Sequence, residues 1–325
     1  MIAFPAHEVD LHRNRPTAMH RSTVWETALT IQPALPFPEL DPLTPDLPLS
    51  VWTTGQQDSR TQRRGRYVAA SMAHPGKMLP AIARHAIEHY TSPDDLVIDP
   101  MCGIGTTLVE AIHLGRDAIG VEYEQRWADL ALENIDHAAD QGATGGATAI
   151  CGDARRIDEL VSKDVVGKAA LVLTSPPYGD SLHGQVRTTR DSGRPNVEKF
   201  NHRYSTDRGN LAHSGLEDLM AGFTEILAGC RRLLRPDGFL AITVRPIRRH
   251  GGLIDIPSMA LDAAVAAGFT PFERCVALLA KVSDSGLTAR ASFFQLVNTA
   301  NARKNGQPLH VPAFEDVLIL RAQLA

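Results

Sequence analysis

The chain has 325 residues, of which 43% are hydrophobic and 22% are charged, and its net charge is −4. This composition suits a globular protein with a sizeable core and excludes a uniformly basic nucleic-acid coat, so nucleic-acid binding would need cations gathered on one face. No apolar run long enough for a membrane span and no secretory signal are visible, and four widely spaced cysteines favour a reducing, cytoplasmic setting without structural zinc or disulfides.

Residues 1–50 differ in composition from the rest of the chain. Six prolines punctuate the stretch IQPALPFPELDPLTPDLPLS, which predicts an extended or irregular arm ahead of a main domain of residues 51–325. A basic cluster, TQRRGRY, follows the arm, and its simplest interpretation is a solvated surface run.

From Lys77 onward, helical and strand patterns alternate. The helices are predicted at 77–90, 105–115, 125–139, 216–234 and 258–268, and the strands at 96–100, 118–122, 147–153, 169–175, 238–244, 272–280 and 315–321. Such alternation predicts parallel β-α-β units, and therefore an α/β, Rossmann-like, doubly wound sheet of about seven strands. Ligands bind such sheets outside the carboxyl ends of the strands.

The ends of the first three predicted strands carry a glycine turn and carboxylates. In DPMCGIGTT, Gly103 and Gly105 permit a sharp turn, while the adjacent Asp99 would repel a pyrophosphate and suits a ligand with a cationic or amino group. Glu122 could accept both hydroxyls of a ribose, and Asp153 could accept from the exocyclic amine of adenine. This set fits S-adenosylmethionine better than a dinucleotide.

The fourth strand ends in TSPPY. Pro176 and Pro177 cannot donate to a sheet, so the strand must end near Thr174 and a stiff, extended segment then delivers Tyr178 to the ligand-binding edge. Taken alone, this pattern is also compatible with a proline-stiffened loop and a packed tyrosine.

With these motifs, the chain resembles the amino-methyltransferases of DNA, the N4-cytosine and N6-adenine family that uses S-adenosylmethionine. The resemblance rests on HPGKMLP, DPMCGIGTT, GVEYE, CGDAR and TSPPY and runs on to FEDVLILRA, covering roughly residues 50–322. It implies that residues 51–325 form the methyltransferase domain. The cofactor residues that it implies, together with the three carboxylates above, are His74, Pro75, Lys77, Asp99, Pro100, Cys102, Gly103, Gly105, Thr106, Glu122 and Asp153.

The resemblance also implies a catalytic role for Ser175, Pro176, Pro177 and Tyr178. The Ser175 hydroxyl and the Pro176 carbonyl would accept the two N–H groups of a base amine, and Tyr178 would stack on a base flipped out of the duplex. A serine in the first position favours cytosine N4 over adenine N6 in this family. Cytosine C5 chemistry is excluded because no Pro-Cys segment supplies the nucleophile.

The stretch 179–214 shows no helical or strand period, and its interleaved cations and aromatic rings predict a substrate-binding loop. The candidate nucleic-acid contacts there and in RPIRRHGG are Arg187, Arg190, Arg194, Lys199, Arg203, Tyr204, Arg248 and Arg249. A disordered, merely solvated insertion is the plain alternative for the loop. The alternatives for the whole protein are RNA amino-methylation and a catalytically inactive binding module of the same fold.

Overall fold

The structure is a computed structural model that describes residues 47–177, 185–188, 197–200, 210–211, 215–249, 252–291 and 293–322. The contacts divide the chain into a unit of residues 1–48 and a unit of residues 49–325, and the second unit contains every predicted site residue. Residues 1–46 of the predicted arm lie outside the described residues. No helix in the described part of the chain is long and apolar enough to cross a membrane.

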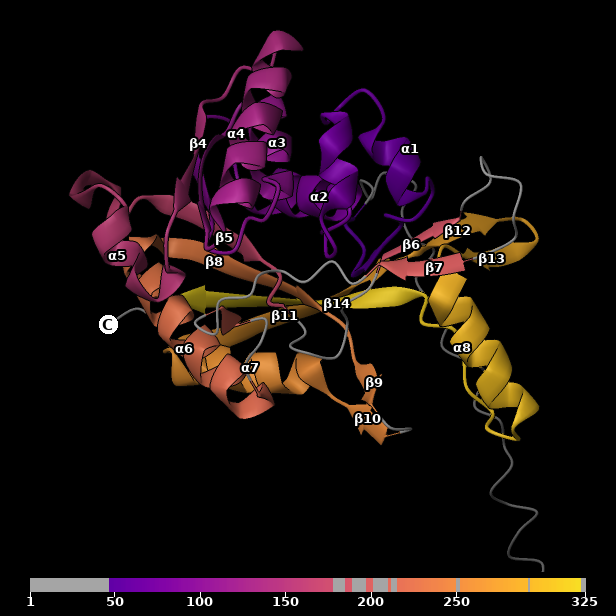
Figure 1. Ribbon diagram of the computed structural model, residues 1–325. Helices are drawn as coiled ribbons and strands as arrows, with labels where there is room; N and C mark the ends of the chain where they lie inside the picture. The colour runs from indigo at the N-terminus through magenta and orange to yellow at the C-terminus, as the bar shows by residue number, and fades with distance from the viewer. Residues whose placement is uncertain are drawn as a thin grey trace, which may run out of the picture. The chain divides into compact units, whose positions relative to one another are not determined.

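The second unit is built on an eight-stranded sheet with the order β1-β11-β14-β8-β5-β2-β3-β4 (Figure 1). Its strands are β1 (Val51–Trp52), β2 (Leu96–Asp99), β3 (Asp117–Glu122), β4 (Ala147–Cys151), β5 (Ala169–Thr174), β8 (Leu234–Val244), β11 (Phe269–Leu278) and β14 (Phe314–Ala322). Neighbouring strands are parallel, except that β14 runs antiparallel to both β8 and β11. All seven predicted strands are present, and this confirms the Rossmann-like, mostly parallel fold.

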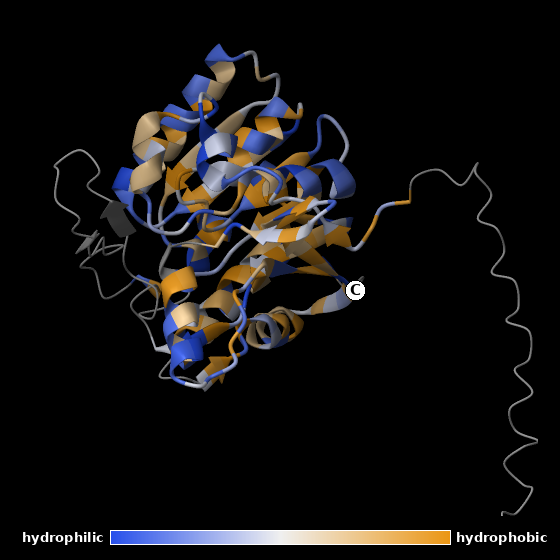
Figure 2. Ribbon diagram, turned by 90° about the vertical axis from the view of Figure 1, so that its right-hand side faces the viewer, coloured by the Kyte–Doolittle hydropathy of each residue, from blue (hydrophilic) through white to orange (hydrophobic). Residues whose placement is uncertain are grey.

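Helices cover both faces of this sheet because successive strand residues point to opposite sides. Val97 and Leu171 pack on the helices α2 (Pro80–Tyr90), α3 (Thr106–His113) and α4 (Gln125–Asp140). Ile98 and Val172 pack on α5 (Ile157–Leu160), α6 (Leu216–Leu233) and α7 (Ile256–Ala266). Figure 2 shows the resulting contrast, with apolar strands inside and mixed polar helices outside.

Several elements were not expected from the sequence. A short helix α1 (Ser59–Arg63) and the edge strand β1 precede the first predicted helix. The stretch 179–214 was expected to lack regular structure, and this expectation was wrong: β6 (Gln185–Thr188) pairs antiparallel with β7 (Val197–Phe200). Four-residue strands amid polar residues are too short for a period of two to stand out.

Further unexpected elements follow β8 and β11. A second pair joins β9 (Ile247–Arg249) and β10 (Gly252–Ile254) directly after β8. A third pair, β12 (Ala280–Ser283) with β13 (Gly286–Ala289), and the helix α8 (Phe293–Lys304) lie between β11 and β14. β8, β11 and the parallel strands end at one edge of the sheet, and the antiparallel β14 begins there. We call this the carboxyl edge.

Candidate active site

The strand order places four of the predicted site segments next to one another along the carboxyl edge. β5, β2, β3 and β4 are consecutive neighbours in the sheet. Ser175 therefore follows one strand, Asp99 ends the next, Glu122 ends the third, and Asp153 lies two residues beyond the fourth. A single ligand lying along this edge could therefore contact all four strand ends, in the order β5, β2, β3, β4.

The glycine segment forms a tight turn into α3, whose first helical residue is Thr106. Gly103 and Gly105 have φ values of 54° and 77°, which residues with a side chain rarely adopt. A Cβ at Gly103 would lie 3.3 Å from the His74 ring, so a side chain there would crowd the ring as well as strain the backbone. The turn thus presents bare backbone at the carboxyl edge, as a closely approaching ligand requires.

Asp99 is buried and braces this turn. Its carboxylate accepts hydrogen bonds from the Thr107 hydroxyl at 2.6 Å and from the backbone N–H of Met101 at 3.1 Å. Burial raises the pKa of Asp99 to about 6, although the hydrogen bonds from Thr107 and Met101 oppose the rise. Asp99 therefore shapes the loop directly, and its remaining lone pairs are what it can offer to a ligand.

Glu122 connects the second strand end to the glycine turn. One carboxylate oxygen accepts from the backbone N–H of Gly103, and the other accepts from that of Glu124, both at 2.9 Å. Burial raises the pKa of Glu122 to about 7, with the nearby Glu124 and Asp99 charges adding to the rise. Two backbone donors fix the orientation of this carboxylate while leaving it acceptor capacity for further hydroxyl groups.

Asp153 has a partner that sequence reasoning missed. The Arg155 guanidinium pairs with its carboxylate at 2.5 Å, and the Arg155 backbone N–H donates to it at 3.0 Å. Burial acts to raise the pKa of Asp153, but these hydrogen bonds outweigh it and the pKa is lowered. Asp153 is thus ionised and paired with Arg155, and this leaves it a weaker acceptor for an adenine amine than an unpaired carboxylate would be.

The His74 ring lies against the glycine turn, and the Lys77 side chain folds back onto the backbone around His74. The His74 ring contacts Trp127 edge-on, with centroids 4.6 Å apart, and burial lowers the pKa of His74 to about 3, so the ring is neutral. The Lys77 ammonium donates to the carbonyls of His74 and Met72, and burial followed by the charge of Arg63 lowers its pKa to about 8. The buried Trp127 indole N–H has no acceptor among the described residues.

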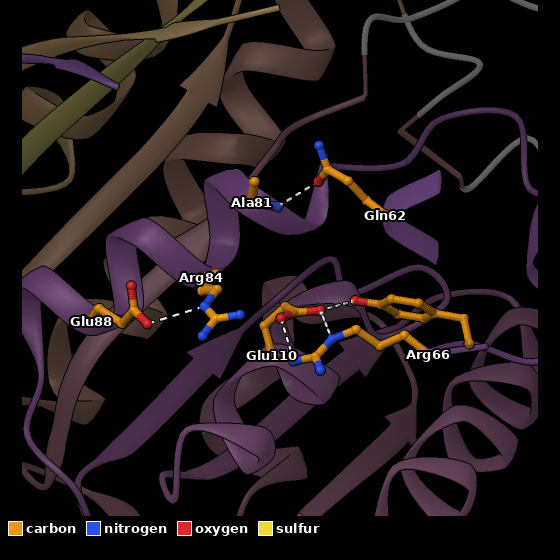
Figure 3. Close-up of polar contacts among 7 residues, drawn as sticks. Gln62, Arg66, Ala81, Arg84, Glu88 and Glu110 are labelled. Atoms are coloured by element: carbon orange, nitrogen blue, oxygen red, sulfur yellow. Dashed lines mark hydrogen bonds and ion pairs between the residues drawn. The ribbon is translucent and has the colours of Figure 1, made fainter. Parts of the chain in front are cut away.

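The segment of residues 59–78, here called the strap, is held onto α3 by the basic cluster. Arg66 forms a two-pronged ion pair with Glu110, at 2.7 and 2.6 Å, and the Tyr67 hydroxyl donates to the same carboxylate (Figure 3). Arg63 is buried and donates to the Met78 carbonyl. The interpretation of this cluster as a solvated surface run was therefore wrong for Arg63 and Arg66, whereas Arg60 and Arg64 are exposed.

Asn134 fastens the strap to the glycine segment. Its amide donates to the Ile104 carbonyl and to the Ser71 hydroxyl, both at 2.9 Å, and its oxygen accepts from the backbone N–H of Val68. The sequence did contain signals for these contacts. Glu110 is a lone carboxylate in an apolar helix, and helical spacing puts Asn134 on the buried face of α4. Both residues therefore had to have hydrogen-bonding partners, because buried polar groups need them.

The segment of residues 175–178, predicted to be catalytic, is described in part. Pro176 is buried, while Ser175 and Pro177 are half-buried, directly after β5 and beside the glycine segment of β2. Tyr178 lies outside the described residues, as do Arg190, Arg194, Arg203 and Tyr204. The backbone of Arg187 and Lys199 lies in the β6–β7 pair, and Arg248 is exposed on β9, where Arg249 follows it.

The cysteines at this edge have no features of a nucleophile. Burial raises the pKa of the Cys102 thiol well above its usual value, with Asp99 and Glu122 adding to the effect, so this thiol stays protonated. Cys102 instead packs against Gly120, where a Cβ would come within 2.7 Å of its sulfur. Within the described ranges, no group of three or more His, Cys, Asp or Glu side chains gathers as a metal site would require.

A shallow pocket of about 700 Å³ lies at the opposite edge, where β2, β3 and β4 begin. Its lining includes Asp94, Asp117, Lys168 and Arg235 and none of the predicted site residues. It is spatially separate from the strand ends described above.

Comparison with known proteins bears on what this arrangement does. A family model described as DNA methylase, of the N6/N4 methyltransferase type, matches residues 11–133. A tRNA (guanine(10)-N2)-dimethyltransferase of Methanocaldococcus jannaschii is 32% identical over 109 residues, which are 33% of this chain and 30% of that protein. The type II methyltransferase M.ScaI of Streptomyces caespitosus is 28% identical over 97 residues, which are 28% of this chain and 29% of that protein.

Among solved structures, TrmN from Thermus thermophilus is 16% identical with a TM-score of 0.46, and the match covers 82% of this chain and 53% of that chain. For the two curated relatives named above, the match covers only about a third of their own length. The family match and the type II methyltransferase relatives support membership of the N4/N6 DNA amino-methyltransferase family, and they support S-adenosylmethionine as the cofactor.

Proposed function

We propose that this member of the N4/N6 amino-methyltransferase family transfers a methyl group from S-adenosylmethionine to the exocyclic amino group of a DNA base, with cytosine N4 as the favoured position. The observation that carries the proposal is the placement of Ser175-Pro176-Pro177 at the end of β5, one strand away from the Asp99 glycine turn. Groups that can accept hydrogen bonds from an amino nucleophile then lie on the same carboxyl edge as the glycine turn, whose bare backbone lets a ligand approach closely.

The residues at the glycine turn suit S-adenosylmethionine. The bare backbone at Gly103 and Gly105 permits close approach, and the fixed Glu122 carboxylate can accept hydroxyl groups. The Trp127 indole N–H, buried and lacking an acceptor among the described residues, is a donor that a bound acceptor group would satisfy. His74, Pro75 and Lys77 would hold the methionine end, Asp153 would face the adenine, and Pro100, Cys102 and Thr106 would line the pocket.

When bound, the cofactor supplies an electrophilic methyl group. The amino group of a base is a poor nucleophile because its lone pair is delocalised into the ring. The Ser175 hydroxyl and the Pro176 carbonyl would accept both N–H groups, favour a pyramidal nitrogen and free the lone pair for attack. The two prolines fix these acceptors in place before the base arrives, and Tyr178 would stack on the flipped base.

Cytosine N4 is favoured over adenine N6 because the catalytic segment begins with serine. Either base offers an exocyclic amine that the same two acceptors could hold, so the mechanism is common to both. RNA is the second candidate substrate, and the observation behind it is the likeness to a tRNA guanine-N2 methyltransferase. A flipped guanine would present its N2 amine to the same segment.

The test is to incubate the protein with labelled S-adenosylmethionine and, separately, unmethylated DNA or RNA, and then to identify the modified nucleoside by mass spectrometry. The expected product is N4-methylcytosine in DNA. N6-methyladenine would keep the mechanism and replace the base, whereas label in RNA alone would replace the substrate. Label in neither polymer, from protein shown by calorimetry to bind the cofactor, would reject the activity and favour an inactive binding module.

A further inference from the structure

The segment between β11 and β14 leaves the sheet and returns to it at the carboxyl edge. Leu278 ends β11 directly opposite Phe314, which begins β14, and the backbone N–H of Leu279 donates to the Ala313 carbonyl at 2.7 Å. Residues 279–313, here called the edge insertion, contain the β12–β13 pair and α8. In Figure 1 these elements lie beyond the end of the sheet at which β14 begins. They therefore flank the edge that carries the catalytic segment.

The edge insertion carries positive charge in a chain that is negative as a whole. It holds the cations Lys281, Arg290, Arg303 and Lys304 and the single carboxylate Asp284, while the chain has a net charge of −4. Arg290 donates to the Gln56 carbonyl at 3.2 Å, and Arg303 donates to the Leu309 carbonyl at 2.9 Å. Lys281 and Lys304 are exposed, and within the described ranges no carboxylate forms an ion pair with either.

Helix α8 is not an ordinary amphipathic surface helix. From Gln295 to Lys304, none of its residues is buried, and Leu296 is 43% exposed. Asn298, Asn301 and Lys304 are all exposed and follow one another at intervals of three residues, so they form one continuous ridge along the helix. From Gln295 onward, the exposed face of α8 is therefore available for contacts outside its own domain.

The chemistry of this ridge fits a nucleic-acid duplex. Asparagine side chains pair with base edges through two hydrogen bonds, and lysines contact phosphates. A helix of 12 residues is about 18 Å long, and the major groove of DNA, about 12 Å wide, admits a helix of this kind.

We propose that the edge insertion is a DNA-binding element, in which Lys281 and Lys304 contact phosphates and the Asn298–Asn301 ridge of α8 reads base edges next to the methylated base. This inference rests on the proposed function, because it places the element beside a catalytic edge that acts on DNA. The edge insertion lies outside the stretch 179–214, to which the sequence assigned substrate binding.

The first experiment measures binding of a short, mixed-sequence DNA duplex as a function of salt concentration. The Lys281→Gln/Lys304→Gln variant is compared with Lys163→Gln/Lys168→Gln, which removes the same charge from exposed positions near the opposite edge. Each phosphate that is no longer neutralised lowers the slope of log affinity against log salt by about 0.9. We expect a slope lower by about 1.8 in the first variant and an unchanged slope in the control.

The second experiment measures base reading. Asn298→Ala/Asn301→Ala should methylate competing sites with less discrimination than the wild type while keeping its affinity for mixed-sequence duplex. Both variants should bind S-adenosylmethionine as the wild type does, since neither changes the strand ends that carry the cofactor residues. Equal salt slopes in wild type and Lys281→Gln/Lys304→Gln, together with unchanged site preference in the asparagine variant, would overturn the proposal.

The outcomes separate this inference from the proposed function. If wild type methylates DNA but both edge-insertion variants match it, the activity stands and the DNA-binding element is elsewhere. If wild type methylates no polymer, the proposed function fails first. The exposed Leu287 and Leu296 raise the competing case of a second copy of the chain on this face. Sedimentation showing a wild-type dimer that Leu287→Gln/Leu296→Gln dissociates would therefore also overturn the proposal.

Discussion

Ser175 follows a fully buried strand and precedes a buried proline, so its backbone is fixed whatever its side chain is. Ser175→Ala should therefore remove a single acceptor and leave the site otherwise intact. We expect the rate of methyl transfer in a single turnover to fall by about 10²- to 10³-fold with unchanged cofactor affinity. Ser162→Ala, at an exposed serine that precedes β5, is the matched control. Full activity in Ser175→Ala would reduce TSPPY to a stiff turn.

Glu122 makes the stability of the protein depend on pH in a distinctive direction. Its pKa of about 7 exceeds the usual 4.5, so the folded state retains a proton that the unfolded state has released, and Glu122 lowers stability progressively as pH rises from about 4.5 to about 7. His74, with its pKa lowered to about 3, acts with the opposite sign below its usual 6.5. The two effects overlap, so the comparison must be made against a variant.

Urea unfolding of wild type and Glu122→Gln across this pH range isolates the contribution of Glu122. The stability of wild type relative to the variant should fall by up to about 3 kcal/mol between the two pKa values, because one pKa unit corresponds to about 1.4 kcal/mol. The absolute stability of the variant is not the readout, since glutamine offers only one acceptor to two backbone donors. Parallel pH curves for the two proteins would contradict the raised pKa.

At this scale the sequence predicted which residues face the carboxyl edge but not what holds them. Asp99, Glu122 and Asp153 could be placed because strand ends follow from periodicity and punctuation. Their hydrogen-bond partners, which are Thr107, Gly103 and Arg155, could not be predicted, because the direction of each carboxylate depends on tertiary packing. Whether the three carboxylates contact the cofactor remains a prediction.

Among the elements, the strap offers the sharpest test of a non-local contact. Arg66→Met would leave the Glu110 carboxylate, 2% exposed, without its counterion, and breaking a buried pair costs roughly 3 kcal/mol. Arg84→Met is the control, since the Arg84–Glu88 pair is exposed and worth less than about 1 kcal/mol. Urea denaturation compares the two variants. Similar losses in both would show that the strap is not held by its ion pair.

A second readout tests whether the strap also shapes the cofactor site. Since the strap carries His74 against Gly103, loosening it should weaken S-adenosylmethionine binding in Arg66→Met and not in Arg84→Met. Replacing both partners, as Arg66→Met with Glu110→Leu, should recover part of the lost stability, because no unpaired carboxylate is buried but the buried Tyr67 hydroxyl loses its acceptor. Calorimetry and denaturation on the same three proteins would reveal whether stability and affinity change together.

The elements that periodicity predicted are those that the core requires. β2, β5 and β8 are apolar on both faces and α6 has a long apolar stripe, so burial alone determines their type. The pairs β6–β7, β9–β10 and β12–β13 are short, and the helix α8 is largely exposed from Gln295 onward. Their local patterns carry no such signal, and the sequence therefore missed them.

For the molecule as a whole, a net charge of −4 means that DNA binding must depend on where the cations lie. Neutralising Arg187, Arg190 and Arg194 together should weaken DNA binding and lower its salt slope by about 0.9 for each phosphate that is no longer bound. Lys168→Gln/Arg231→Gln/Arg232→Gln removes the same charge near the opposite edge, where β5 and β8 begin, and is the control. An unchanged slope in the first variant would assign DNA binding to other cations.

The meeting of β11 and β14 has a consequence for how this protein can be altered. Because Leu278 and Phe314 face each other across an antiparallel ladder, residues 279–313 are bounded by two strands that a tight hairpin turn could join without moving the sheet. The edge insertion could therefore be exchanged for another segment without disturbing the strands that carry the predicted site residues. If the edge insertion binds DNA as proposed, exchanging it for a different segment should change which DNA sites are bound and leave the residues at the other strand ends unchanged.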